Sequence, residues 1–224
     1  MRTIRLEQVD STNLYAKGFR EDVIVIAREQ TAGRGTKGRS FSSRKGGLYL
    51  TKLVHDLPFG AQELFRVMTD AAVAVCKTAE AFGLNPSVKW ANDVLLNGKK
   101  ACGILIENTV SGNRIAASAV GIGVNVNNEI PAELKEIATS FSEAAGREIP
   151  LEEAEDRLLS CLERRYSLDE YRAYLRFLGK KITVRTADSV FEGFAKDVDE
   201  IGRLLVERGG KTTAYAAAEV SIRL

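Results

Sequence analysis

The sequence predicts a protein in which a larger domain mixes strands and helices and a small second domain contains strands alone. Apolar runs at residues 23–27, 48–54 and 115–127 are typical of strands, and a helical apolar stripe covers residues 60–82. The C-terminal part instead shows short alternating strands separated by turn residues, as in a small antiparallel barrel or sandwich. We therefore expect two domains, over residues 1–178 and 179–224.

The N-terminal segment combines a predicted strand at residues 2–9 with a short capped helix that follows it. Between them stand four consecutive polar residues, Asp10, Ser11, Thr12 and Asn13. A helix N-cap explains one of the four, and this is the structural interpretation of the group. The functional interpretation is that the surplus polar groups line a small pocket.

A basic, glycine-rich loop follows the strand at residues 23–27. Between Gly33 and Gly47 there is no acidic residue, and there are five cations, Arg34, Lys37, Arg39, Arg44 and Lys45. Glycines let backbone N–H groups approach an anion, and arginine adds fork-shaped donors. The loop nearly matches a P-loop, but Arg39 replaces the essential lysine and no helix begins after Ser40, so we reject that motif. It is either a mobile anion-binding loop or a solvated basic loop.

The next candidate is a lysine beside a predicted hairpin. Lys89 interrupts an apolar run between Val88 and Trp90, and Asn97-Gly98 is the strongest short hairpin signal. A lysine near the end of a buried-looking strand is costly to desolvate unless it has an anionic partner. Lys89 therefore either binds an anion or extends its amine to the surface.

The later segments are predicted mainly from periodicity. In the strand at residues 115–127, Gly121 and Gly123 either admit a flat ring, with Asn125 able to read its polar edge, or mark a bulged core strand. Two helices are expected, over residues 131–146 and 151–178. The strands of the second domain are expected around residues 182–184, 190–191, 204–206 and 220–222.

Composition and charge limit the classes of function. A formal net charge of +2 argues against a constitutive nucleic-acid binder. The three cysteines, Cys76, Cys102 and Cys161, are interpreted as buried thiols in a reducing cytosol, and the single histidine, His55, cannot anchor a zinc cluster. Because the sequence shows neither a membrane-length apolar run nor a signal peptide, we expect a cytoplasmic protein without membrane contact.

Six blocks in the same order make the chain resemble biotin–protein ligases. They are Asp10 to Asn13, the GRGTKGRSF loop with Gln30 before it, Lys89-Trp90-Ala91-Asn92-Asp93, Lys100 to Glu107, Gly121 to Asn125, and Glu219-Val220-Ser221. The resemblance covers almost the whole chain. It implies an α/β (α+β) mixed-sheet catalytic domain of the class II synthetase-like type and a small SH3-like β-barrel C-terminal domain.

The resemblance also implies a reaction and its participants. Biotin and ATP would form biotinyl-5′-AMP and pyrophosphate, and a lysine of a biotin carboxyl carrier domain would then take the biotin. Mg²⁺ would accompany ATP through its phosphates, with no metal held by the protein alone. Some relatives carry an N-terminal DNA-binding domain. Here the motifs begin at residue 10, so we expect no such domain and no binding to DNA, while a homodimer stays open.

The same resemblance assigns roles to individual residues. Lys89 and Arg34 would be catalytic. Biotin would be bound by Ser11, Thr12, Asn13, Gln30, Arg34, Gly35, Thr36 and Lys89. ATP and the adenylate would be bound by Arg34, Gly35, Thr36, Lys37, Phe41, Trp90, Asn92 and Asn125.

Four positions depart from the family's usual pattern. Thr36 stands in place of an arginine, which predicts weaker retention of the adenylate unless Lys37 compensates. Ala91 stands in place of a proline, Phe41 of a tryptophan, and Ala218 of a glycine, and these changes are interpreted as tolerated packing differences.

Two alternatives are kept beside this interpretation. A lipoate–protein ligase is similar in fold and reaction, but its Arg-Arg-x-Ser-Gly-Gly-Gly loop is absent. A nucleic-acid-binding module would use the basic loop and the C-terminal barrel. Apart from Phe41, however, the cations of that loop are not interleaved with aromatic residues.

Overall fold

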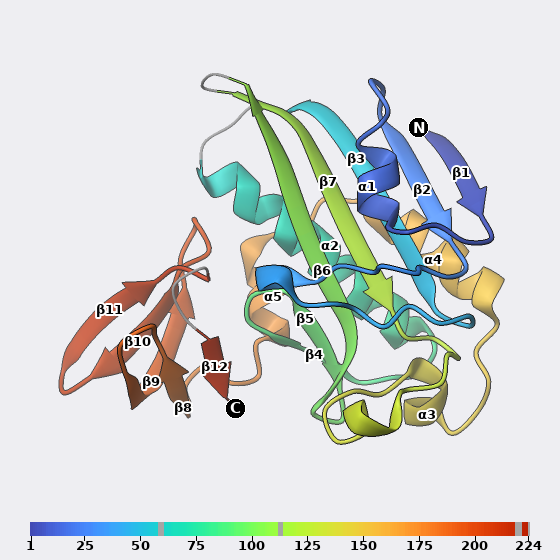
Figure 1. Cartoon of the computed structure of the whole chain (residues 1–224). Coiled ribbons are helices and arrows are strands. Elements are labelled where there is room, and N and C mark those ends of the chain that lie inside the picture. The colour runs from blue at the N-terminus through green and yellow to red at the C-terminus, as the bar shows by residue number, and fades with distance from the viewer. Residues whose placement is uncertain (58–60, 112–113, 218–220, 224) are drawn as a thin grey trace.

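The computed structural model describes residues 1–57, 61–111, 114–217 and 221–223, and two β-sheets account for most of this part of the chain (Figure 1). The larger sheet has the strand order β1 (Arg2–Leu6), β2 (Val23–Ala27), β3 (Leu48–Leu57), β7 (Arg114–Val124), β6 (Lys99–Ser111), β5 (Asp93–Leu96) and β4 (Pro86–Lys89). The smaller sheet has the order β11 (Lys211–Tyr215), β10 (Leu204–Arg208), β9 (Val190–Val198), β8 (Lys181–Arg185) and β12 (Ser221–Arg223).

The pairing confirms the predicted fold class. Strand β1 runs parallel to β2, whereas β2, β3, β7, β6, β5 and β4 pair antiparallel, so the larger sheet is mixed. The smaller sheet is antiparallel throughout its described strands. Strand β11 was not among the predicted strands, because Lys211–Tyr215 carries little apolar character beyond its last two residues.

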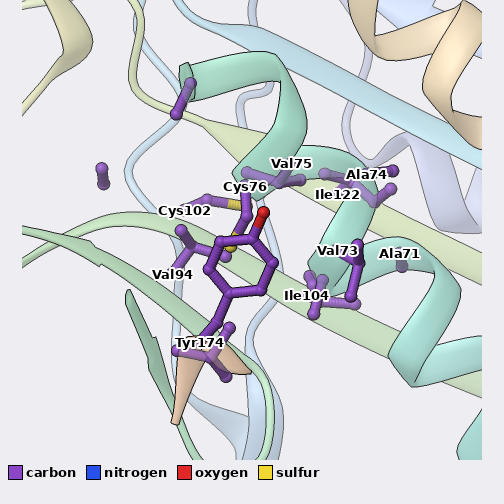
Figure 2. Close-up of a cluster of buried hydrophobic side chains, with 14 of the residues drawn as sticks. Ala71, Val73, Ala74, Val75, Cys76, Val94, Cys102, Ile104, Ile122 and Tyr174 are labelled. Carbon is purple, nitrogen blue, oxygen red and sulfur yellow. The ribbon is translucent and has the colours of Figure 1, made fainter. Parts of the chain in front are cut away.

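One face of the larger sheet is covered by the long helix α2 (Ala61–Ala81). Figure 2 shows Val73 and Cys76 of this helix lying against Cys102 and Ile104 of β6. Burial raises the pKa of both thiols, which therefore stay protonated. The interpretation of the cysteines as buried thiols is confirmed, because all three are free and buried.

The predicted helix over residues 131–146 is wrong. Over these residues the structure has one 3₁₀ turn, η2 (Ala132–Leu134), followed by a separate short helix, α3 (Phe141–Ala145). Ser140 and Glu143 form a capping box, in which each side chain satisfies the other residue's backbone N–H. This local cap starts a new helix where the apolar pattern indicated a continuation.

The predicted helix over residues 151–178 is also divided. It consists of α4 (Leu151–Leu162) and α5 (Leu168–Tyr174), and a second capping box, between Ser167 and Glu170, starts α5. Both helices pack against α2, so the division lets one amphipathic stretch follow two directions over the same core. In the described residues, no helix combines the length and apolar character that crossing a membrane requires.

The two sheets share a hydrophobic core. Ile182 and Val184 of β8 belong to the same buried cluster as Val73 and Ile104. The boundary between residues 178 and 179 stays a prediction. Ala218 and the Glu219-Val220 pair of the C-terminal block lie outside the described residues, as does Gly60.

Candidate active site

The floor of the candidate site is a row of residues that the strand register places side by side. Lys89 in β4 lies opposite Asp93 in β5, and Asp93 lies opposite Gly103 in β6. Gly103 pairs with Gly123 in β7, which in turn pairs with Tyr49 in β3. Because directly opposed residues point to the same face of a sheet, this face presents an ammonium, a carboxylate and two glycines in line.

The two glycines make room for the ring of Phe41, which comes from the basic loop. A Cβ atom at Gly123 would lie 2.7 Å from Phe41 Cε1, and one at Gly103 would lie 3.1 Å from Phe41 Cε2. The same ring makes an edge contact with Tyr49, with 6.5 Å between the ring centroids. The glycines therefore leave room for a flat ring, and in this structure the ring is that of Phe41 from the loop. Whether they also admit the ring of a ligand, as one of the two interpretations of the sequence has it, stays a prediction.

A network of hydroxyl and amide groups lies beside this floor. Gln30 Oε1 accepts hydrogen bonds from the Thr12 backbone N–H at 2.8 Å and from its hydroxyl at 3.1 Å. The Thr51 hydroxyl donates to Asn13 Oδ1 at 2.6 Å. Ser11 is the N-cap of helix α1 (Thr12–Ala16), but its side chain makes no cap hydrogen bond. The N-cap interpretation therefore does not account for the Ser11 hydroxyl, and Ser11 lines a narrow cavity of about 40 Å³.

Glu107 connects this network to the basic loop. Its carboxylate accepts from Asn13 Nδ2 at 2.8 Å and from Lys17 Nζ at 3.0 Å, and it lies 3.2 Å from Arg34 Nη1. Burial alone would raise the pKa of Glu107, but the hydrogen bonds from Asn13 and Lys17 and the two positive charges outweigh it and lower the pKa. Glu107 is therefore ionised at neutral pH and holds the Arg34 guanidinium at the first cavity.

The basic loop contains a single 3₁₀ turn, η1 (Thr36–Gly38), where a P-loop would begin an α-helix. Arg39 donates to the Thr36 carbonyl oxygen at 3.2 Å and to its hydroxyl at 3.0 Å. The guanidinium beside Thr36 thus belongs to Arg39. Lys37, which the sequence offered as a compensating cation, has a φ of 58° and lines neither cavity.

A second, larger cavity of about 530 Å³ adjoins the first. Lys89 and Arg39 line it, and among the described residues the Lys89 ammonium has no ion-pair or hydrogen-bond partner. Asp93 and Lys100 also line it, and the Lys100 Nζ lies 2.7 Å from Asp93 Oδ1. The arrangement joins a narrow cavity rich in amides and hydroxyls to a wide cavity with unneutralised positive charge.

The structure brings most of the predicted residues to these cavities. The first is lined by Ser11, Thr12, Asn13, Gln30, Arg34, Asn92 and the loop residues Gly35, Thr36 and Phe41. Lys89 and Asn125 line the second instead. The Asn125 amide is engaged on both sides, because Nδ2 donates to the Thr139 carbonyl at 3.1 Å and Oδ1 accepts from Asn128 at 3.1 Å.

Trp90 is placed differently from the prediction. It lines neither cavity, and its indole N–H donates to the Gly202 carbonyl oxygen at 3.1 Å. Trp90 is the first residue after β4, which ends at Lys89. Its ring is buried where the hairpin meets the turn that contains Gly202. A direct contact of this indole with a nucleotide has no support in the geometry.

Sequence reasoning missed the roles of Lys100, Asp93 and Glu107 at this site. All three stand inside the blocks that carried the family resemblance, but none stood out by residue type. The Asn97-Gly98 turn fixes which residues of β5 and β6 lie opposite each other. Pairing the strands outward from that turn would have put Lys100 opposite Leu95, two residues from Asp93.

Two family models match the chain. One, described as the biotin/lipoate A/B protein ligase family, matches residues 4–125. The other, described as the biotin protein ligase C terminal domain, matches residues 177–223. The first model contains the glycine-rich loop and the Lys89 hairpin, and the second contains the smaller sheet.

Curated proteins and solved structures are also similar to the chain. It is 35% identical over 220 residues to the bifunctional ligase/repressor BirA of Bacillus subtilis, covering 90% of this chain but 66% of that protein. It is 32% identical to a biotin–[acetyl-CoA-carboxylase] ligase of Paracoccus denitrificans, covering 96% of this chain and 98% of that one. The solved biotin protein ligase of Aquifex aeolicus in complex with biotin and ATP superposes with a TM-score of 0.82 at 28% identity, covering 99% and 98% of the two chains. The chain thus spans slightly less than two thirds of the length of the Bacillus relative.

Proposed function

Because this chain belongs to the biotin/lipoate A/B protein ligase family, we propose that it is a biotin–protein ligase that joins biotin to a carrier domain at the expense of ATP. It has the biotin protein ligase fold, an α+β domain followed by a small SH3-like domain. The observation that carries the proposal is the pair of adjoining cavities. The narrow one offers amides and hydroxyls, and the wide one offers the ammonium of Lys89, which is unpaired among the described residues.

The polar end of the first cavity favours biotin over lipoate. Biotin's ureido ring carries two N–H donors and a carbonyl acceptor, whereas the dithiolane ring of lipoate carries no such groups. Among the described residues, the Ser11 hydroxyl has no cap partner. Thr12 and Gln30 are fixed by hydrogen bonds to each other, and Asn13 is fixed by Thr51 and Glu107. A rigid set of donors and acceptors selects a ligand that satisfies them, because leaving buried polar groups unpaired is costly.

The reaction has two steps. A carboxylate oxygen of biotin forms a bond to the α-phosphorus of ATP, the bond from that phosphorus to the bridging oxygen breaks, and pyrophosphate leaves. The acceptor amine then attacks the carbonyl carbon of biotinyl-5′-AMP, loses a proton, and AMP leaves with the bonding electron pair. Negative charge collects on phosphate and carboxylate oxygens in both transition states, so fixed cations at the junction of the cavities supply the main catalytic effect.

The residues of this chain divide that work. Lys89 lines the larger cavity and has no partner in the described part of the chain, which suits it to the triphosphate. Arg34 is held by Glu107 at the first cavity, where the biotin carboxylate would lie. Mg²⁺ is expected to arrive bound to ATP. The described residues contain no group of three His, Cys, Asp or Glu side chains that would hold a metal by themselves, and Asp93 and Glu136 are the carboxylates facing the larger cavity.

One assay tests the proposal against its rivals. Exchange of labelled pyrophosphate into ATP is measured with biotin, with lipoate and without either acid. Biotin-dependent exchange, followed by labelling of a biotin carboxyl carrier domain on one lysine, is the expected result. Lipoate-dependent exchange would identify a lipoate ligase. Absence of exchange together with salt-sensitive binding to nucleic acid would instead identify a binding module.

The partners beyond the substrates belong to the same proposal. The carrier is expected to be the biotin carboxyl carrier domain of a biotin-dependent carboxylase in the cytoplasm.

We expect no sequence-specific DNA binding, and a footprint on duplex DNA that persists at high salt would contradict this. Light scattering with and without biotin and ATP distinguishes a monomer from a homodimer. Weaker adenylate retention through Thr36 stays a prediction.

A further inference from the structure

Lys89 stands at the end of an edge strand of the larger sheet. Strand β4 is last in the strand order and pairs with β5 alone. Within the described chain, the Lys89 ammonium has no ion-pair or hydrogen-bond partner. Its direction therefore depends on the backbone of β4 and of the turn that follows, from Trp90 to Asn92.

Each residue of this turn is bonded to a different part of the molecule. The Trp90 indole donates to the Gly202 carbonyl at 3.1 Å, and Asn92 exchanges two hydrogen bonds with β6. The Ala91 carbonyl accepts from the Tyr171 hydroxyl at 2.9 Å. Tyr171 belongs to α5, which packs against β4 (Figure 1). A side chain of a distant helix therefore holds the middle of the turn.

The Tyr171 side chain is itself held in place. It is fully buried, and the ring of Phe65 in α2 meets its ring in a T-shaped contact, with 5.4 Å between the centroids. Burial raises the pKa of Tyr171, so the hydroxyl keeps its proton and stays a donor. In the part of the chain that the structure describes, no other donor reaches the Ala91 carbonyl. Loss of the hydroxyl would leave this buried carbonyl unpaired and release the turn.

We propose that Tyr171 is a positioning residue of the ligase, which fixes the turn after Lys89 through Ala91 and so aims the Lys89 ammonium into the larger cavity. This deepens the proposed function and rests on it. Tyr171 lines neither cavity, so its effect on the reaction passes through Lys89. A cation already in place when the triphosphate binds needs no reorganisation, and a displacement of about 1 Å can slow a reaction about a hundredfold.

The rival explanation is that Tyr171 only contributes to the stability of the core. Tyr171→Phe removes the hydroxyl and keeps the ring. Tyr166→Phe is the matched control, because the buried Tyr166 hydroxyl also donates to a main-chain carbonyl, that of Cys161 at 3.1 Å, and Tyr166 lines neither cavity. Both variants should have a lower urea midpoint, since each leaves a buried carbonyl without its donor.

Only one of the two variants should lose activity. With saturating biotin and ATP, biotin-dependent pyrophosphate exchange is expected to fall about tenfold in Tyr171→Phe and to stay within about twofold in Tyr166→Phe. The KM for biotin should change less than about twofold in both, because biotin occupies the other cavity. An equal loss of exchange in the two variants would show a purely structural role and overturn the proposal.

A double-mutant cycle tests whether Tyr171 acts through Lys89. Residues that act as a unit give non-additive effects. In the Lys89→Ala background, Tyr171→Phe should therefore slow the residual exchange by less than about twofold. A further tenfold fall in that background would mean that Tyr171 acts independently of Lys89, and would also overturn the proposal.

Trp90 provides a measurement that does not depend on activity. It is the single tryptophan and directly precedes Ala91, so release of the turn should make its fluorescence easier to quench with acrylamide. Quenching should rise in Tyr171→Phe and stay at the wild-type level in Tyr166→Phe. Unchanged quenching in Tyr171→Phe would show that the hydroxyl does not fix the turn.

A second variant covers the case in which Tyr171→Phe does not fold. Phe65→Leu keeps the Tyr171 hydroxyl but removes the ring that holds it, and should lower exchange about threefold, with no further effect in Lys89→Ala. Normal exchange in whichever variant folds overturns the role of Tyr171 alone. A wild-type protein without biotin-dependent exchange overturns the proposed function itself, and the quenching of Trp90 then still tests the contact.

Discussion

Lys89 and Lys100 lie around the same cavity but have different surroundings. Lys100 is paired with Asp93, whereas Lys89, which lies opposite Asp93 in the strand register, has no recorded partner among the described residues. An unpaired ammonium beside a bound anion gains more than one already neutralised by a carboxylate. At the residue scale, Lys89 is therefore the cation with most to contribute to a bound triphosphate.

The first prediction concerns Lys89→Ala. We expect biotin-dependent pyrophosphate exchange to fall by about a hundredfold or more, because a fixed charge at the reacting phosphate is lost. Stability should change by less than about 0.5 kcal/mol, since no ion pair is broken. Lys45→Ala is the control, because Lys45 is a lysine of the basic loop that is exposed and lines neither cavity. Near-normal exchange by Lys89→Ala would remove it from the mechanism.

The second prediction concerns Glu107→Gln and pH. The pKa of Glu107 is lowered on folding, so its ion pairs stabilise the protein above the pKa of the unfolded chain, near 4.3, and are lost as pH falls through the lower folded value. At pH 7 we expect Glu107→Gln to lose roughly 0.5–1 kcal/mol of unfolding free energy, and to bind biotin more weakly because Arg34 is released.

The measurement is urea unfolding at several pH values between about 7 and about 2.5. The difference between wild type and variant should stay constant down to about pH 5 and shrink as the pH falls below about 4.3. Glu133→Gln is the control, since Glu133 is exposed in η2. A gap that stays constant over this range would contradict an electrostatic role for Glu107.

At the scale of elements, the basic loop is attached to the sheet by few contacts. Phe41 rests on Gly103 and Gly123, and Arg34 is paired with Glu107, while residues 37–40 are exposed. Two backbone hydrogen bonds, from Gly35 to Arg39 and from Phe41 to Gly33, close the loop on itself. Segments with so little buried surface open at low free energy, so the loop is suited to admit ligands and close over them.

The third prediction is protection of this loop by ligands. In the free protein, trypsin should cut after Arg34, Lys37, Arg39 or Lys45, and biotin together with ATP should slow this cleavage at least tenfold. The exposed β10–β11 turn near Lys211 serves as the internal reference, because it lies in the other sheet. Equal cleavage of the loop with and without both ligands, at constant cleavage of the reference, would count against closure.

At the scale of the whole molecule, the C-terminal sheet is part of the support of the site. Trp90, next to Lys89, donates to the Gly202 carbonyl, and the Tyr171 hydroxyl donates to the Ala91 carbonyl at 2.9 Å. Arg172 of α5 pairs with Asp197 of β9 at 2.8 Å. The hairpin that carries Lys89 is thus fixed by helix α5 and by the turn between β9 and β10. Figure 1 shows α5 and β4 on the side of the larger sheet nearest the smaller one.

The fourth prediction compares two glycines with positive φ. Gly202 has a φ of 82°, and a Cβ there would overlap the Phe65 ring, whereas Gly210 has a φ of 78° and open space around it. Gly210→Ala should cost about 1–2 kcal/mol of unfolding free energy from backbone strain. Gly202→Ala should cost roughly 2–5 kcal/mol, because overpacking adds to the same strain.

Trp90 is the single tryptophan and is buried at this contact, so its fluorescence reports on it directly. Unfolding in urea, followed by fluorescence and by circular dichroism, should give coincident transitions in the wild type. If the two substitutions cost the same, the Phe65 ring does not restrict the space at Gly202 and the overpacking explanation is wrong.

Local patterns were sufficient for much of the fold and part of the site. Apolar runs predicted β2, β3 and β7, and the Asn97-Gly98 turn predicted the hairpin with Lys89 near a strand end. The polar run from Asp10 and the glycine-rich loop were identified by residue type. These features depend on neighbours in the sequence, which is why one sequence reveals them. The two long predicted helices failed because capping boxes at Ser140 and Ser167 outweighed the apolar period.

Only the tertiary structure decided those features that depend on which strands and distant segments lie next to each other. The direction of Lys100 depends on a bulge that exists only when β6 pairs with β5, and a strictly alternating strand would have placed its amine in the core. The pairing of Arg34 with Glu107 joins residues far apart in the chain, and the position of Trp90 depends on Gly202. Residue type and spacing can indicate that an ammonium or a carboxylate is available. Which charges meet at one point is set by register and by contacts between distant segments, because a shift of one residue in pairing reverses the face on which a side chain lies.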